Sequence, residues 1–166
     1  MTMDGILVEQ LLLNELRSRG MTFAAAESCT GGLIAKRITD LSGASAVFRG
    51  GVVSYTNDVK RDVLGVPQTL LDAYGAVSAP VAQAMAEGAR RITGADLAVS
   101  VTGVAGPDRD DRGNEVGTVY IALAHGGGTT DRLFLFHGDR AAIRSAAADA
   151  AFCLLMQHIN ENQPTD

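Results

Sequence analysis

Three short segments of the chain combine glycines with side chains that can carry out chemistry. They are residues 28–32 (SCTGG), residues 54–57 (SYTN) with Lys60 one turn later, and residues 100–107 (SVTGVAGP). Each follows or ends a stretch that is typical of a β-strand, and ligands of open α/β sheets gather beyond the C-terminal ends of strands. We therefore expect the three segments to face one cleft.

Ser28 and Lys60 are the first candidates for a nucleophile and its base. A serine before a Gly-Gly helix start can attack a carbonyl carbon while backbone N–H groups bind the oxyanion, or it can contact a phosphate. A lysine in a covered crevice loses solvation, its pKa falls, and its neutral amine can take the serine proton. Tyr55 would then relay a proton or hydrogen-bond the lysine. Purely structural roles stay open for all of these residues. Ser28 or Thr30 would then only cap the helix, Lys60 would be a solvent-exposed lysine, and Tyr55 would only pack against its neighbours.

Two other interpretations of the same segments stay open. Cys29 is a rival nucleophile, because a thiolate is favoured beside a helix N-terminus, and Glu27 or Lys60 would then be its base. The plain alternative is that Cys29 is a small buried residue. The glycine-rich segments would also suit a nucleotide-binding module that performs no catalysis.

The histidines and cysteines do not form a metal-binding pattern. All three histidines, His125, His137 and His158, lie outside the three segments, so a Ser-His-Asp triad or a histidine-ligated metal is less favoured than a lysine-based site. Cys29 and Cys153 are far apart and neither belongs to a CxxC pair. We therefore expect no metal and no other cofactor.

Anion binding would need local positive charge, since the formal net charge is −5. Arg140 and Arg144 stand four residues apart at the start of the last expected helix and can hold a phosphate or carboxylate with paired hydrogen bonds. A solvated helix face is the simpler role for at least one of them. The charges between Asp108 and Arg112 are most simply explained as loop solvation.

The composition fits one α/β domain. The chain has 166 residues, of which 46% are hydrophobic and 20% charged, with 19 glycines, and a chain of this length buries roughly 70% of its unfolded surface. No run of Lys or Arg appears, so nucleic acid is not an expected partner. The apolar runs fall short of about 20 residues and no signal peptide is apparent, so we expect no membrane association and a cytoplasmic location.

The hydrophobic spacing predicts alternating helices and strands. Helices are expected over residues 4–19, 33–39, 58–64 with Asn57 as cap, 79–92 with Ser78 as cap, and from Asp139 to a frayed tail at 160–166. Strands are expected over residues 22–26, 50–55, 96–104, 117–124 and 132–136, with an exposed loop over 108–115. This order predicts a three-layer α/β/α sandwich with a mixed, mostly parallel sheet.

Several long motifs resemble the CinA C-terminal domain family. They are AAESCTGG (25–32), GGVVSYTNDVKRDVLGV (50–66), GAVSAPVAQAMAEGAR (75–90), SVTGVAGP (100–107) and VGTVYIAL (116–123), and they cover nearly the whole chain. The family includes nicotinamide mononucleotide deamidases, which hydrolyse the carboxamide of that nucleotide to nicotinic acid mononucleotide and ammonia without a metal. The resemblance implies this activity here, in a single amidohydrolase domain over residues 1–166 without the N-terminal domain of longer CinA proteins.

The resemblance also implies roles for individual residues. The nucleophile of the motif is Ser28, and the tyrosine and lysine of SYTNxxK are Tyr55 and Lys60 as further catalytic residues. The expected substrate-binding residues are Thr30, Gly31, Gly32, Thr102, Gly103 and Arg140, with the amides around residues 30–32 as oxyanion donors.

This chain departs from the family pattern in one loop. The family continues GPD with glycine, whereas Arg109 stands there in this chain, which bears on loop contacts with the substrate and not on the nucleophile. The expected partners are a small nucleotide substrate and further copies of the same chain.

Overall fold

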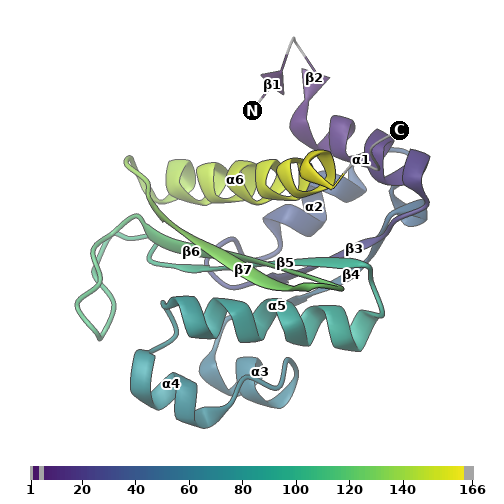
Figure 1. Ribbon diagram of the computed structural model, residues 1–166. Coiled ribbons are helices and arrows are strands. Elements are labelled where there is room, and N and C mark those ends of the chain that lie inside the picture. The colour runs from purple at the N-terminus through teal and green to yellow at the C-terminus, as the bar shows by residue number, and fades with distance from the viewer. Residues whose placement is uncertain (1, 4–5, 163–166) are drawn as a thin grey trace.

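The computed structural model describes residues 2–3 and 6–162, which form three layers (Figure 1). The middle layer is a five-stranded sheet. One face is covered by α1 (Val8–Arg19), α2 (Leu33–Thr39) and α6 (Arg140–Glu161), and the other by α5 (Ala79–Thr93), behind which lie α3 (Asn57–Asp62) and α4 (Gln68–Tyr74). A short 3-10 helix spans Ala44–Ala46, and β1 (Thr2–Met3) pairs with β2 (Ile6–Leu7). Within these described residues, no helix combines the length and hydropathy needed to span a bilayer.

The sheet is mixed. Its order is β4 (Phe48–Val53), β3 (Phe23–Glu27), β5 (Leu97–Gly103), β6 (Thr118–His125) and β7 (Gly128–Leu135). The β4–β3 and β3–β5 pairings are parallel, whereas β5–β6 and β6–β7 are antiparallel. The predicted α/β sandwich with a mixed sheet is confirmed. "Mostly parallel" describes the strand directions, in which β6 alone is reversed, but only half of the pairings.

Small residues let the layers approach closely around β3. Its sequence FAAAE is buried at every position, and Ala25 pairs with Gly51 on one side and Val99 on the other. A Cβ atom at Gly51 would lie 3.0 Å from the Ala25 carbonyl oxygen. Beneath the sheet, a Cβ at Gly88 of α5 would overlap the carbonyl oxygen of Leu64, so the segment after α3 lies directly on the α5 backbone. This contact holds α3 against the sandwich.

The ends of several elements differ from the predictions. The first helix begins at Val8 rather than at residue 4, which lies outside the described residues. Strand β4 starts two residues earlier than expected because Phe48 packs on Phe23, with ring centroids 5.0 Å apart. Strand β7 also starts earlier, because the hairpin pairs from His125 and Gly128 onward. The last helix continues through residues 160–161, and the rest of the expected frayed tail, 163–166, lies outside the described residues.

Two predicted caps act differently from the prediction. Asn57 is the first residue of α3, and Thr56 is the cap, its hydroxyl accepting from the Val59 amide at 3.4 Å. Ser78 does precede α5, but its hydroxyl donates to the Gly75 carbonyl at 2.8 Å instead of capping the helix. Helix α4, seven residues long, is not among the elements that the hydrophobic spacing predicts.

A guanidinium joins the three helices on the upper face. Arg37 of α2 donates to both carboxylate oxygens of Glu9 in α1 at 2.9 Å and lies 2.8 Å from an oxygen of Asp149 in α6. The same group sits 5.1 Å from the ring centroid of Phe152. Because Glu9 is buried, this pairing fixes α2, and with it the segment before α2, against the neighbouring helices.

Replacing Arg37 by alanine should destabilise the fold strongly. The change leaves the buried Glu9 carboxylate without its counter-ion, and breaking a buried pair costs about 3 kcal/mol or more. Urea unfolding measures the loss. Lys36→Ala on the same helix is the matched control, because Lys36 belongs to an exposed pair with Asp40 that contributes less than about 1 kcal/mol. Equal losses for the two variants would contradict the structural role of Arg37.

Candidate active site

Ser28 and Lys60 lie in direct contact at the C-terminal ends of the parallel neighbours β3 and β4. Ser28 follows β3, and its amide extends the ladder by donating to the Val101 carbonyl at 2.9 Å. The Ser28 hydroxyl oxygen is 2.9 Å from Lys60 Nζ. Two residues that are far apart in sequence thus meet because β3 and β4 are parallel neighbours whose ends share one edge of the sheet.

Glu27 shapes the turn that carries Ser28. Its buried carboxylate accepts hydrogen bonds from three backbone amides at the start of α2, those of Gly32 (3.0 Å), Ile34 (3.1 Å) and Ala35 (2.9 Å). These bonds satisfy amides that a helix leaves unpaired at its first turn. The carboxylate is therefore committed to the helix, which contradicts its alternative role as a base for Cys29.

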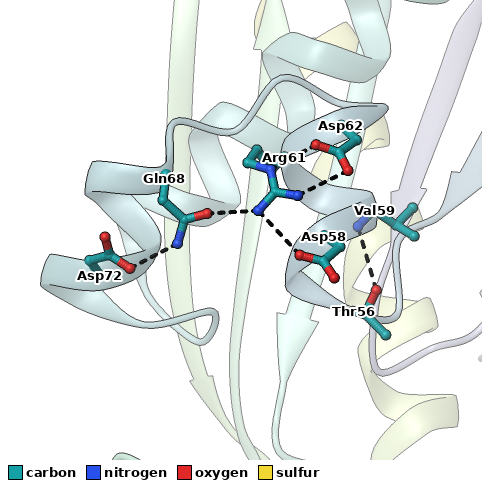
Figure 2. Close-up of polar contacts among 7 residues, drawn as sticks. All are labelled: Thr56, Asp58, Val59, Arg61, Asp62, Gln68 and Asp72. Atoms are coloured by element: carbon teal, nitrogen blue, oxygen red, sulfur yellow. Dashed lines mark hydrogen bonds and ion pairs between the residues drawn. The ribbon is translucent and has the colours of Figure 1, made fainter.

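The short helix α3 presents Lys60 to the sheet and is held from its outer side by Arg61. Figure 2 shows Arg61 contacting Asp58 and Asp62 of its own helix and donating to Gln68 of α4 at 3.1 Å. Lys60, in contrast, is 1% exposed and donates to the Ser54 carbonyl at 2.7 Å. This carbonyl orients the amine toward Ser28.

Burial favours the neutral form of Lys60. Loss of solvation lowers the pKa of Lys60 to about 8 from its ordinary value of 10.5. Within the described part of the chain no carboxylate forms an ion pair with Lys60. The charge of a Cys29 thiolate acts in the opposite direction, but it is the smaller effect and that thiolate is scarce at neutral pH. When neutral, the amine keeps one N–H on the Ser54 carbonyl and turns its lone pair to the Ser28 hydroxyl. The order nucleophile, base and orienting acceptor is that of an activated serine.

Arg144 holds the turn after Ser28 from the other side. It donates to the carbonyls of Cys29 (3.1 Å) and Thr30 (2.8 Å). Because a trans peptide unit points its N–H opposite to its C=O, the Thr30 amide faces away from Arg144. The amide of Cys29 donates to no other described residue, and Cys29 lines the cleft, so this amide is available to a ligand. Thr30 is fully buried and lies outside that lining.

The expected oxyanion role of two glycine amides is not supported. The Gly31 amide donates to the Ser28 carbonyl at 3.1 Å, and that of Gly32 to Glu27. Both donors are therefore occupied. Both glycines have positive φ, 59° and 99°, which bends the chain from the strand into α2, so their role is in the turn itself.

Cys29 does not have the properties of a nucleophile. It lines the cleft but is only 6% exposed. Burial raises the pKa of its thiol to about 11, so the thiolate is scarce at neutral pH.

Among the described residues, no group of three or more His, Cys, Asp or Glu side chains lies close enough together to hold a metal ion.

A cleft of about 230 Å³ opens beside Ser28. Its lining includes the expected residues Tyr55, Gly103 and Arg140, and also three loop residues that were not expected, Asp108, Arg109 and Asp110. Four other expected substrate-binding residues, Thr30, Gly31, Gly32 and Thr102, are not part of this lining.

Thr102 and Tyr55 differ from their expected roles. The Thr102 side chain is buried and its hydroxyl donates to the Ala76 carbonyl at 2.7 Å. Tyr55 is 57% exposed and its hydroxyl accepts from Arg140 at 2.8 Å. Arg140 also donates to the Gly106 carbonyl at 2.6 Å. Since Lys60 contacts Ser28 directly, no tyrosine relay is needed between them, and Tyr55 with Arg140 forms one wall of the cleft.

The charged loop between β5 and β6 is held in place by specific hydrogen bonds, and its charges do more than keep it solvated. It projects beyond the layers of the sandwich (Figure 1). The Asp110 carboxylate accepts from the amides of Arg112 (3.1 Å) and Asn114 (2.7 Å) and from the Asn114 side chain (2.7 Å). Arg112 donates to the carbonyls of Leu71 (3.3 Å) and Asp72 (2.6 Å) in α4. The expectation of simple solvation is therefore wrong for Asp110 and Arg112. The sequence feature that could have predicted this ordered loop is the Asp-x-Arg-x-Asn spacing, which is typical of a turn stabilised by an aspartate side chain.

Comparison with known proteins agrees with this fold. The CinA C-terminal domain model matches residues 7–159. A CinA-like protein of Geotalea uraniireducens is 52% identical over 141 residues, which are 85% of this chain and 34% of that protein. A CinA-like protein of Geobacter sulfurreducens is 53% identical over 86% of this chain and 35% of its own length. The chain thus spans about a third of the curated relatives it matches.

Solved structures give the same result over nearly their full lengths. A CinA superfamily protein from Klebsiella pneumoniae superposes with a TM-score of 0.91 at 31% identity, covering 93% of this chain and 96% of that one. A competence/damage-inducible protein from Agrobacterium tumefaciens gives 0.87 at 38% identity, with coverages of 96% and 99%. The chain belongs to the CinA C-terminal domain family.

Proposed function

We propose that the chain is an amidohydrolase that converts nicotinamide mononucleotide to nicotinic acid mononucleotide and ammonia. The observation that carries the proposal is the 2.9 Å contact between Lys60 Nζ and Ser28 Oγ, because it joins a nucleophile to a buried amine whose pKa is about 8. Serine and lysine form one of the nucleophile–base pairs that replace a histidine triad. The CinA resemblance of the sequence supplies the substrate.

Acylation begins with neutral Lys60. The amine takes the proton of Ser28 Oγ, and the oxygen forms a bond to the carboxamide carbon while the C=O electron pair moves to its oxygen. The amide of Cys29 donates to this oxyanion, and a donor of this kind contributes about 3 kcal/mol. The Lys60 ammonium then gives its proton to the amide nitrogen, and ammonia leaves with the electrons of the C–N bond.

Deacylation reverses these roles with water. Lys60, again neutral, takes a proton from a water molecule whose oxygen attacks the acyl carbon. The oxyanion collapses, the Ser28 oxygen leaves, and Lys60 returns the proton to it. The product is a carboxylic acid. Tyr55 and Arg140 contact the parts of the substrate that lie outside the reacting group.

The cleft suits a ligand that is only partly enclosed. Its volume of about 230 Å³ lies below the roughly 300–1,000 Å³ of pockets that surround a whole ligand. The carboxamide would lie next to Ser28 and the rest of the nucleotide along the rim, where carboxylate and guanidinium groups both occur. Nicotinamide mononucleotide carries a pyridinium cation and a phosphate anion, so it can use both.

Two separate substitutions at adjacent positions test which residue is the nucleophile. Ser28→Ala should lower ammonia release from nicotinamide mononucleotide by several orders of magnitude, because no attacking oxygen remains. Cys29→Ala is the matched control and should keep most of the activity, since its thiol is protonated and buried. A coupled ammonia assay measures both. The reverse pattern would support a cysteine amidase, and no release by the unchanged protein would support a nucleotide-binding module.

The pH dependence of the reaction should report Lys60. Because the neutral amine is the active form and its pKa is about 8, kcat/KM should rise from pH 7 and level off above pH 9. Lys60→Arg should not restore activity, because arginine stays protonated. A profile that is flat across pH 7–9 while ammonia release is fast would rule out this lysine as the base.

Lys60→Met should remove activity and reveal the stability cost of the buried amine. In the unchanged protein, the pKa of Lys60 is lower in the folded state than in the unfolded chain. Between about pH 8 and pH 10.5 the folded state therefore binds fewer protons, and the free energy of unfolding increases as the pH rises. Methionine lacks this dependence. In urea unfolding, the stability of the variant relative to the unchanged protein should therefore fall by about 2 kcal/mol between pH 7 and pH 10. A constant difference would mean that Lys60 has an ordinary pKa.

A further inference from the structure

Arg109 lies on the cleft but takes no part in the chemistry of Ser28 and Lys60. It belongs to the loop between β5 and β6 and lines the same cleft as Ser28. The loop around it is fixed by the bonds of Asp110 to Asn114 and of Arg112 to α4. The backbone of Arg109 is therefore held beside the cleft, and its side chain can reach a ligand there.

The present partner of Arg109 is weak and replaceable. Arg109 Nη2 lies 3.0 Å from Glu115 Oε1, with the two side chains 63% and 75% exposed. Glu115 is not part of the cleft lining. An exposed pair of this kind contributes little free energy, whereas a phosphate offers a guanidinium two charge-assisted hydrogen bonds at once. An anion in the cleft can therefore displace Glu115.

The other charged groups of the cleft are less suited to an anion. The Arg140 guanidinium is already bound to the Gly106 carbonyl and the Tyr55 hydroxyl. The Asp110 carboxylate is used by three donors of its own loop, and Asp108 carries a negative charge. Of the two described cations that line the cleft, Arg109 is the one whose contact is to an exposed carboxylate.

We propose that Arg109 is a specificity-determining residue that binds the phosphate group of the substrate whose carboxamide lies at Ser28. The proposal rests on the amidase function proposed above and assigns to this loop the choice between phosphorylated and unphosphorylated substrates. On binding, the guanidinium exchanges Glu115 for two phosphate oxygens. Asp108 beside it disfavours anions that lack such a paired contact.

The test compares nicotinamide mononucleotide with nicotinamide riboside, which differ by the phosphate. Arg109→Ala should raise the KM for the mononucleotide about tenfold or more and leave the riboside unchanged, because only the first loses a charged hydrogen bond. Glu115→Gln should lower the KM for the mononucleotide alone, since it removes the competing carboxylate. Lys36→Ala, which removes an exposed cation of α2 from an exposed pair, should leave both substrates unchanged.

Two results would overturn the proposal. One is an Arg109→Ala variant with the KM of the mononucleotide unchanged. The other is an equal loss for both substrates, which would indicate that the residue only supports the loop. Calorimetry with nicotinic acid mononucleotide and its riboside separates this test from the reaction itself. If the unchanged protein releases no ammonia, the amidase function fails, while weaker binding of the mononucleotide alone to Arg109→Ala still supports the phosphate contact.

Discussion

The burial of one amine without a carboxylate partner is the constraint on which the candidate site depends. Lys60 is 1% exposed, and its hydrogen-bond partners are the Ser54 carbonyl and the Ser28 hydroxyl. A histidine would serve as a base at neutral pH in water, but a lysine does so only where its surroundings disfavour the ammonium. The fold must therefore supply a closed place for Lys60 beside a strand end.

The small residues of the layers supply that place. Gly88 lets the segment after α3 lie on the α5 backbone, and the alanines of β3 let both helical layers approach the sheet. Arg61 ties α3 to α4 on the outer side (Figure 2). The residue before it, Lys60, is buried on the inner side of the same helix. Larger side chains at these positions would move α3 away and admit water to the amine, which would restore its ordinary pKa.

The sequence predicted the meeting of Ser28 and Lys60 because it depends on few features. Both follow predicted strands, and parallel neighbours end at the same edge of a sheet. The roles of Gly31 and Gly32 depended instead on the buried Glu27 carboxylate taking the amides of α2, which no local pattern reveals. For Thr102 a signal did exist. Strand residues alternate between faces, so Thr102 and Gly103 cannot both face the cleft, and the structure puts Gly103 there.

Three arginines near the site, Arg144, Arg140 and Arg109, show why residue type alone does not assign function. Arg144 binds two carbonyls of the turn and so fixes its amides, and Arg140 binds a carbonyl and a phenol in the wall of the cleft. Each of these guanidiniums has contacts that break if it turns to a ligand. The bond geometry around an arginine thus separates a residue that builds a site from one that can exchange its partner. In this protein the rigid contacts are concentrated around Ser28, where the function proposed above needs an oxyanion donor held in place before the reaction starts. Exchangeable contacts lie at the rim, where different substrates differ.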